Sequence, residues 1–130
     1  MITNLHASIV ACMADAVIFS DRDGVVRVWN AAAERLFGFT AAEAIGQTME
    51  VIIPERLRAA HWRGFEAAMA TGQLRLSGRP TVTRAVHKDG RRLYIEMSFA
   101  VVLADEGIVG ATAVARDVTD REEQARSNAR

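Results

Sequence analysis

The sequence predicts an α+β domain built on an antiparallel sheet, and three features lead to this prediction. Two β-rich runs flank a glycine-containing turn near the start of the chain. Segments with helix-capping residues follow, and from Pro80 onward the pattern takes the period of two that is typical of strands. The expected order is therefore two strands, a block of helices and three strands, which is an α+β arrangement.

The chain is expected to begin with a helix and a hairpin. Leu5, Ile9 and Cys12 recur at helical spacing, which predicts a short N-terminal helix with one apolar side. Residues 16–20 and 25–29 are the two β-rich runs, and the short turn between them favours an antiparallel hairpin.

Two capped helices should follow the hairpin. Asn30 is the expected N-cap of a helix that Gly38 ends, because asparagine caps helix starts and glycine tolerates the left-handed conformation at helix ends. Thr40 and Glu43 have the spacing of a capping box and begin a second short helix, which should end near Gly46.

The longest helix and the last three strands complete the domain. Pro54 suits the first turn of a helix, and Gly72 is its expected end. The strands are expected over residues 81–86, 93–103 and 107–117, with a turn at Lys88-Asp89-Gly90-Arg91 after the first of them.

The last segment, residues 119–130, is almost wholly polar and so cannot contribute to the core. Thr119 is a candidate cap for the helix-favouring residues after it. One interpretation is a frayed terminus, and the other is a connector to an effector domain in a longer protein. The expected division is an N-terminal helix over residues 1–13, one domain over residues 14–118, and the start of a C-terminal signalling helix over residues 119–130.

Charge and composition exclude several kinds of protein. Sixteen basic residues balance sixteen acidic residues, so no overall field attracts nucleic acid or an anionic membrane. No apolar run reaches the roughly 20 residues that cross a bilayer, and the start of the chain lacks the pattern of a signal peptide, so we expect a cytoplasmic domain without membrane contact. The single cysteine, Cys12, excludes an intrachain disulfide.

Three groups of residues carry a resemblance to a known family. They are residues 29–39 with Glu43, Ile45 and Gly46, the turn Lys88-Asp89-Gly90, and the closing Asp117-Val118-Thr119. In their order and spacing they resemble PAS domains, and the resemblance covers the chain from about Met13 to Thr119. It implies a five-stranded antiparallel sheet with helices over one face, and a sensory, dimerising input module for an effector domain elsewhere. In that family Asp117 and Thr119 would mark the point where the last strand leads into the output helix.

One histidine interrupts an apolar stripe on the longest predicted helix. Leu57, His61, Phe65 and Ala68 follow at spacings of four, four and three, which places them on one face. A neutral imidazole in an apolar cavity is what haem iron needs as an axial ligand. The simpler interpretation is a helix histidine that forms a hydrogen bond with a neighbour.

The segment from Pro54 to His61 also resembles the haem-ligating segment of the FixL-type oxygen sensors. The resemblance implies haem on His61, Arg79 as a donor to bound oxygen, and Met97 and Phe99 as apolar residues over the distal side. Arg79 could instead be a surface or ion-pairing residue. Ala67 stands where those sensors have a basic residue near a haem propionate; Arg63 and Arg75 are the possible substitutes.

Three hypotheses of function therefore remain. The first is a sensory domain that binds haem through His61 and detects oxygen or another diatomic gas. The second is a PAS domain that binds another small molecule, or nothing, and acts in dimerisation and signal relay. The third is a small cavity enzyme with His61 as general base, which ranks lowest because no second catalytic group and no nucleophile or phosphate motif is evident.

Overall fold

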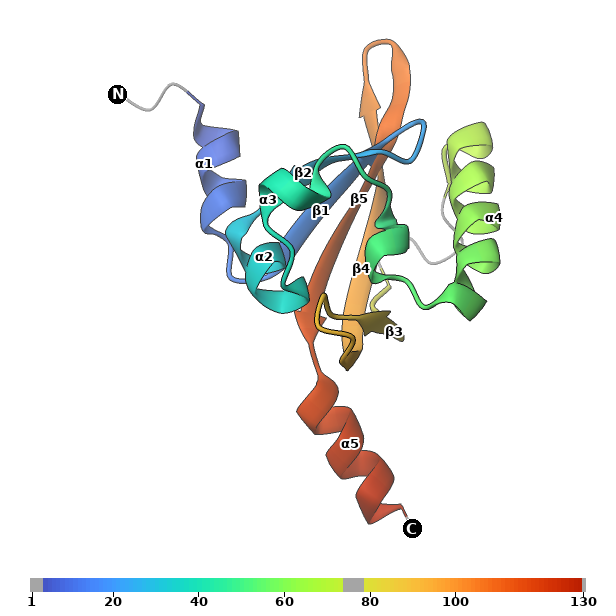
Figure 1. Cartoon of the computed structure of the whole chain (residues 1–130). Coiled ribbons are helices and arrows are strands. Elements are labelled where there is room, and N and C mark those ends of the chain that lie inside the picture. Colours follow the sequence, from blue (N-terminus) through green and yellow to red (C-terminus); the bar gives the residue numbers. More distant parts are fainter. Residues whose placement is uncertain (1–3, 74–78, 130) are drawn as a thin grey trace.

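The computed structural model describes residues 4–73 and 79–129. These residues form one five-stranded antiparallel sheet in the order β2-β1-β5-β4-β3, which confirms the predicted fold class (Figure 1). The strands are β1 (Ala16–Asp21), β2 (Val26–Trp29), β3 (Thr81–Val86), β4 (Arg92–Ala104) and β5 (Gly107–Asp117). The first and last strands lie side by side at the centre of the sheet, with Ala16 opposite Ala115.

Most of the helices separate the second strand from the third, as the sequence predicts. The helices are α1 (Leu5–Cys12), α2 (Ala31–Phe37), α3 (Ala41–Ala44), the 3-10 helix η1 (Met49–Ile52), α4 (Glu55–Thr71) and α5 (Thr119–Asn128). The sequence did not predict η1, which follows Thr48 as its cap. None of the helices within the described ranges has the length and apolar character to cross a membrane.

Asn30 ties three elements together at the start of α2. Its Oδ1 accepts hydrogen bonds from the backbone N–H of Val17 (2.9 Å) and of Ala33 (3.0 Å), so the predicted N-cap is confirmed. Its Nδ2 donates to the carbonyls of Val10 (2.8 Å) and Asp15 (3.1 Å). Because Asn30 is only 6% exposed, these four bonds satisfy a polar group that water hardly reaches.

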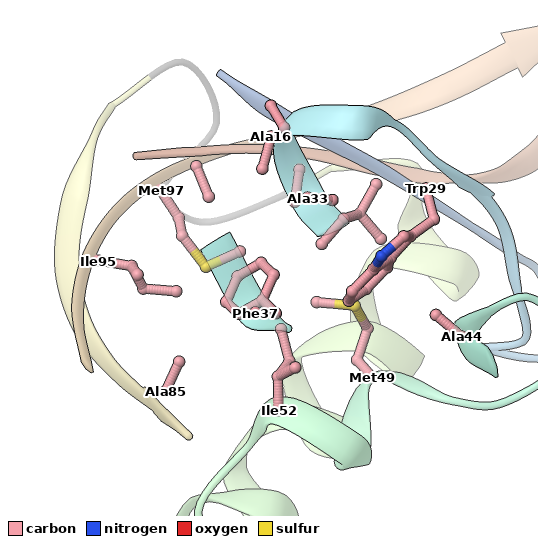
Figure 2. Packing of buried hydrophobic residues seen from close by; sticks show 14 of the residues in the cluster. Ala16, Trp29, Ala33, Phe37, Ala44, Met49, Ile52, Ala85, Ile95 and Met97 are labelled. Atoms are coloured by element: carbon pink, nitrogen blue, oxygen red, sulfur yellow. The ribbon is translucent and has the colours of Figure 1, made fainter. Parts of the chain in front are cut away.

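The close-packed core lies between α2 and the sheet. Phe37 and Ala33 are fully buried, and the rings of Trp29 and Phe37 are 5.5 Å apart. Figure 2 shows the Phe37 ring in the middle of the cluster, between Met97 from β4 and Met49 from η1. Such packing leaves little space at this end of the helical layer.

Alanines cover the helix-facing side of the central strand. Side chains alternate between the two faces of a strand, and Ala111, Ala113 and Ala115 of β5 share the face of the buried cluster. Ala113 lies opposite Phe99, and Ala115 opposite Met97. The part of the sheet face that β5 contributes beneath the helices is therefore made of methyl groups.

Candidate functional site

A cavity of about 300 Å³ lies between α4, η1 and the strands β3 and β4. Its lining is mostly apolar: Met49, Ile52, Ile53, Leu57, Ala60, Ala85, Ile95, Met97 and Phe99. The other lining residues are His61, Thr81, Thr83 and Arg84. This volume is at the lower end of the roughly 300–1,000 Å³ that ligand pockets occupy.

Two side chains of α4 fasten the helix that forms one wall. Arg58 donates to the backbone carbonyls of Ile53 (3.1 Å) and Glu50 (3.2 Å), and Trp62 Nε1 donates to the Glu50 carboxylate. The Trp62 ring also packs on the β1–β2 turn at Gly24, where an added Cβ would come within 2.5 Å of the ring. The start of α4 is thus held to η1, and its middle to the turn.

His61 lies on the wall that α4 forms. Its ring is half-buried, edge-on to Trp62 at 5.0 Å between centroids and stacked near Phe65 at 6.3 Å. Burial lowers the pKa of the His61 imidazole below its ordinary value, and the charge of Glu50 partly opposes this effect. The imidazole is therefore held in its neutral form near pH 7.

Nothing in residues 4–73 and 79–129 forms a hydrogen bond with the His61 ring. The interpretation of His61 as a residue bonded to a neighbour therefore finds no support in this part of the chain. A neutral imidazole on an apolar wall has a free lone pair, which can coordinate a metal or accept a hydrogen bond from a ligand.

Two threonines of β3 face the same cavity, and sequence reasoning missed them. Thr81 pairs with Met97 and Thr83 with Ile95, which are buried residues of β4. The Arg84 side chain belongs to the opposite face of the sheet, where its Nη2 donates to the Tyr94 hydroxyl (3.1 Å). Among the described residues, the polar side chains that face the cavity are thus an imidazole and two hydroxyls. The spacing of two between Thr81 and Thr83 predicts that they share one face of a strand, but it does not show whether that face points to the cavity.

The structure brings together most of the predicted site residues. Leu57, His61, Met97 and Phe99 line the cavity. Phe65 borders a smaller adjoining pocket of about 40 Å³, to which His61 and Phe99 also contribute.

The basic residues are placed differently. Arg79 is exposed in the segment before β3, which begins at Thr81, and it is absent from the cavity lining. Arg63 is exposed on α4, and Arg75 lies outside the described residues.

The end of β5 is bonded to β4 through the predicted junction. Asp117 Oδ1 accepts from the backbone N–H of Thr119 (2.8 Å), and Thr119 Oγ1 accepts from the backbone N–H of Tyr94 (3.0 Å). The N–H of Val118 donates to the Tyr94 carbonyl (2.9 Å). Thr119 is therefore not the helix cap that the sequence predicted: it is the first residue of α5, and its side chain joins the helix to the sheet.

The cavity fits haem in two respects. It offers one neutral imidazole as an axial ligand, and its walls are apolar, as the macrocycle requires. Within the described lining no cationic side chain faces the cavity to pair with the haem carboxylates. The described residues also contain no cluster of three histidine, cysteine, aspartate or glutamate side chains that would hold a bare metal ion.

Comparison with known proteins gives a consistent result. A family model described as the PAS fold matches residues 12–123. The chain is 30% identical over 116 residues to the sensor protein FixL of Bradyrhizobium diazoefficiens, an alignment that covers 89% of this chain and 23% of FixL. It is 32% identical over 107 residues to the oxygen sensor protein DosP of Escherichia coli, with 82% of this chain and 13% of DosP covered. The chain thus spans less than a quarter of these relatives' length.

A solved structure shares the fold. The PAS domain of a protein from Colwellia psychrerythraea superposes with a TM-score of 0.76 at 24% identity, covering 88% of this chain and 95% of that one.

Proposed function

The chain belongs to the PAS family of sensory domains, and we propose that its cavity binds haem with the imidazole of His61 as the iron ligand. The observation that carries the proposal is a neutral, half-buried imidazole without a hydrogen-bond partner in the described chain, on the wall of an apolar cavity. When bound, haem iron would supply a site for oxygen or another diatomic gas.

The residues of the chain have separate roles in this proposal. His61 would hold the iron, Leu57 and Phe99 would supply apolar surface for the macrocycle, and Trp62 and Arg58 keep α4 in position through Glu50. The proposal assigns no role to Arg79, because that side chain is exposed. The similarity to DosP, whose name describes an oxygen sensor, supports the proposal.

Titration of the purified chain with haemin tests the proposal. We expect one haem per chain, a sharp Soret band, and loss of that band in His61→Ala. His6→Ala is the matched control, since His6 is exposed on α1 and should leave the band unchanged. A chain that takes up no haemin, or a His61→Ala variant that binds haemin as the unmodified chain does, would contradict the proposal.

A second candidate is a small uncharged ligand that forms hydrogen bonds. The observation in its favour is the pair of hydroxyls, Thr81 and Thr83, in a cavity of about 300 Å³ into which no charged side chain of the described lining points. Mass spectrometry of the chain under non-denaturing conditions should then find a bound small molecule, without a Soret band, that is lost in Thr83→Val. Retention of the molecule in Thr83→Val and in His61→Ala would exclude this cavity as its site.

The remaining parts of the proposal concern the longer protein. We place the domain in the cytoplasm and assign it no catalytic step of its own, since α5 would pass the state of the cavity to an effector outside this chain. Homodimerisation through α1 is also proposed, because Leu5 and Ile9 are 54% and 51% exposed. Sedimentation should show a dimer that Ile9→Lys dissociates; a monomer at all concentrations would contradict this.

A further inference from the structure

Three side chains from three elements meet on the sheet face opposite the cavity. Arg84 of β3 lies over the Tyr94 ring of β4, with its guanidinium carbon 5.2 Å from the ring centroid. Arg126 of α5 lies over the same ring at 5.0 Å. Guanidinium groups at this distance are attracted to the face of an aromatic ring. Arg84 of β3 and Arg126 of α5 therefore contact the ring of the same tyrosine.

Tyr94 holds α5 at two points. Its backbone N–H and carbonyl bond to Thr119 and Val118 at the start of the helix, and its ring contacts Arg126 two turns later. Residues seven apart lie on the same side of a helix, and helix side chains lean toward the N-terminus, so the Arg126 side chain reaches back to the sheet. The direction of α5 thus depends on the ring of Tyr94.

Arg84 connects this cluster to the cavity. Its neighbours Thr83 and Ala85 line the cavity, while Arg84 itself points to the other face and pairs with Tyr94 across the strands. Since adjacent residues of a strand share one backbone, a group that presses on Thr83 from the cavity moves Arg84 on the far side.

The contacts of this cluster are of a kind that a small displacement can break. Among the described residues, neither Arg84 nor Arg126 has a carboxylate within 4.0 Å, whereas Arg121 of the same helix forms an ion pair with Glu96 at 3.3 Å. The two guanidinium groups are held by the ring, and Arg84 also by the hydroxyl. Their position therefore follows the position of Tyr94 and β3.

We propose that the cluster of Arg84, Tyr94 and Arg126 couples the cavity to the output helix. A group that fills the cavity against Thr83 displaces β3, breaks the bond from Arg84 to the Tyr94 hydroxyl and lets the ring turn away from Arg126. The start of α5 stays attached through Thr119, while its second turn becomes free to take another direction. This inference rests on the proposed function only in that some ligand fills the cavity, whether or not that ligand is haem.

The shift of the Arg126 side-chain protons in an NMR spectrum of the full chain reports the contact, because protons over an aromatic ring are displaced upfield. We expect this displacement in the unmodified chain and its loss in Tyr94→Leu. Thr83→Leu, which fills the cavity with a side chain in place of a ligand, should reduce the displacement at least by half. Thr81→Leu fills the same cavity from two positions earlier and serves if Thr83→Leu does not fold.

A second substitution tests the route through Arg84. In Arg84→Gln, adding Thr83→Leu should no longer change the Arg126 shift. Arg92→Gln is the matched control, since Arg92 is an exposed arginine on the same strand as Tyr94, and adding Thr83→Leu to it should still reduce the displacement. The proposal is overturned if folded Thr83→Leu and Thr81→Leu leave the Arg126 shift unchanged, or if Arg84→Gln does not alter the response. Both tests are independent of haemin uptake.

Discussion

Asn30 and His61, a buried and a half-buried polar side chain in different parts of the helical layer, differ in how the fold bonds them. Asn30 at the start of α2 uses its oxygen and its nitrogen in four hydrogen bonds to Val17, Ala33, Val10 and Asp15. His61 on α4 is half-buried and forms no hydrogen bond within the described residues.

The difference separates a polar group that the fold uses for its own bonds from one that stays available to a ligand. Burial without a partner costs free energy, so a fold normally satisfies its buried polar groups, as it does at Asn30. At His61, burial disfavours the charged form, and this lowers the pKa of the imidazole. The neutral ring keeps a lone pair that no described residue uses and that a ligand could take, which is why the α4 end is the candidate site.

The largest effect on stability is expected at Asn30, whose polar atoms are all hydrogen-bonded. Asn30→Ala removes the N-cap and four hydrogen bonds, and it leaves the buried N–H groups of Val17 and Ala33 without that partner, so we expect a loss of about 3 kcal/mol in the free energy of unfolding. Urea denaturation measures it. Asn4→Ala is the control: Asn4 caps α1 by accepting from Ala7 but is exposed, on a helix with no buried residue, so the loss should stay below about 1 kcal/mol. Equal losses would remove the contrast between a buried and an exposed cap.

The next effect concerns the turn that supports α4. Gly24→Ala puts a side chain at a φ of +83° and within 2.5 Å of the Trp62 ring, so we expect a loss of about 2–3 kcal/mol and a shift of α4. Gly46→Ala meets the same backbone strain at a φ of +96° but no neighbour within 4 Å, and should cost about 1 kcal/mol. Denaturation of both variants, with tryptophan fluorescence as the signal, compares them. If Gly24→Ala and Gly46→Ala lowered the free energy of unfolding equally, the contact between Trp62 and the turn would not contribute to stability.

Replacing His61 should have only a small effect on stability. His61→Leu removes no hydrogen bond within the described chain and relieves the burial of an imidazole, so the free energy of unfolding should change by less than about 1 kcal/mol. The same urea denaturation measures it. A loss as large as that of Asn30→Ala would mean that His61 is a structural residue and would contradict the assignment of the cavity.

The pH dependence of stability should show the smallest effect. Because the folded-state pKa of His61 is lowered, the unfolded chain binds more protons as the pH falls below about 6.5, and the folded state loses stability there. Thermal unfolding at about pH 7.5 and about pH 5.5 should show a larger decrease in Tm for the unmodified chain than for His61→Gln. An identical decrease in both would mean that the imidazole titrates equally in the folded and unfolded states.

Local sequence signals account for most of the fold. The Asn30 cap, the Thr40–Glu43 capping box and the glycine ends of α2 and α4 were all predictable, because each depends on residues only a few positions apart. The other three bonds of Asn30 were not, since Val10, Asp15 and Val17 approach it only in the folded chain.

The site was partly predictable for the same reason. Helical spacing placed Leu57 and His61 on one face of α4, and the structure puts both on the cavity wall. The position of Arg79 was a matter of where a strand begins, which sequence reasoning places only within a few residues. Thr81 and Thr83 were missed because their spacing shows only that they share a face, and the pairing with Met97 and Ile95 shows which face it is.

The alanines of β5 set the depth of the smaller pocket separately from the polar groups of α4 and β3. Ala113 lies beneath the smaller pocket that His61 and Phe99 border, whereas the imidazole and the hydroxyls come from α4 and β3. A longer side chain at Ala113 would fill the smaller pocket while the imidazole and the hydroxyls stayed in place. The space open to a ligand and the polar groups that would bond to it thus come from different elements, so substitutions on β5 could change the first without changing the second.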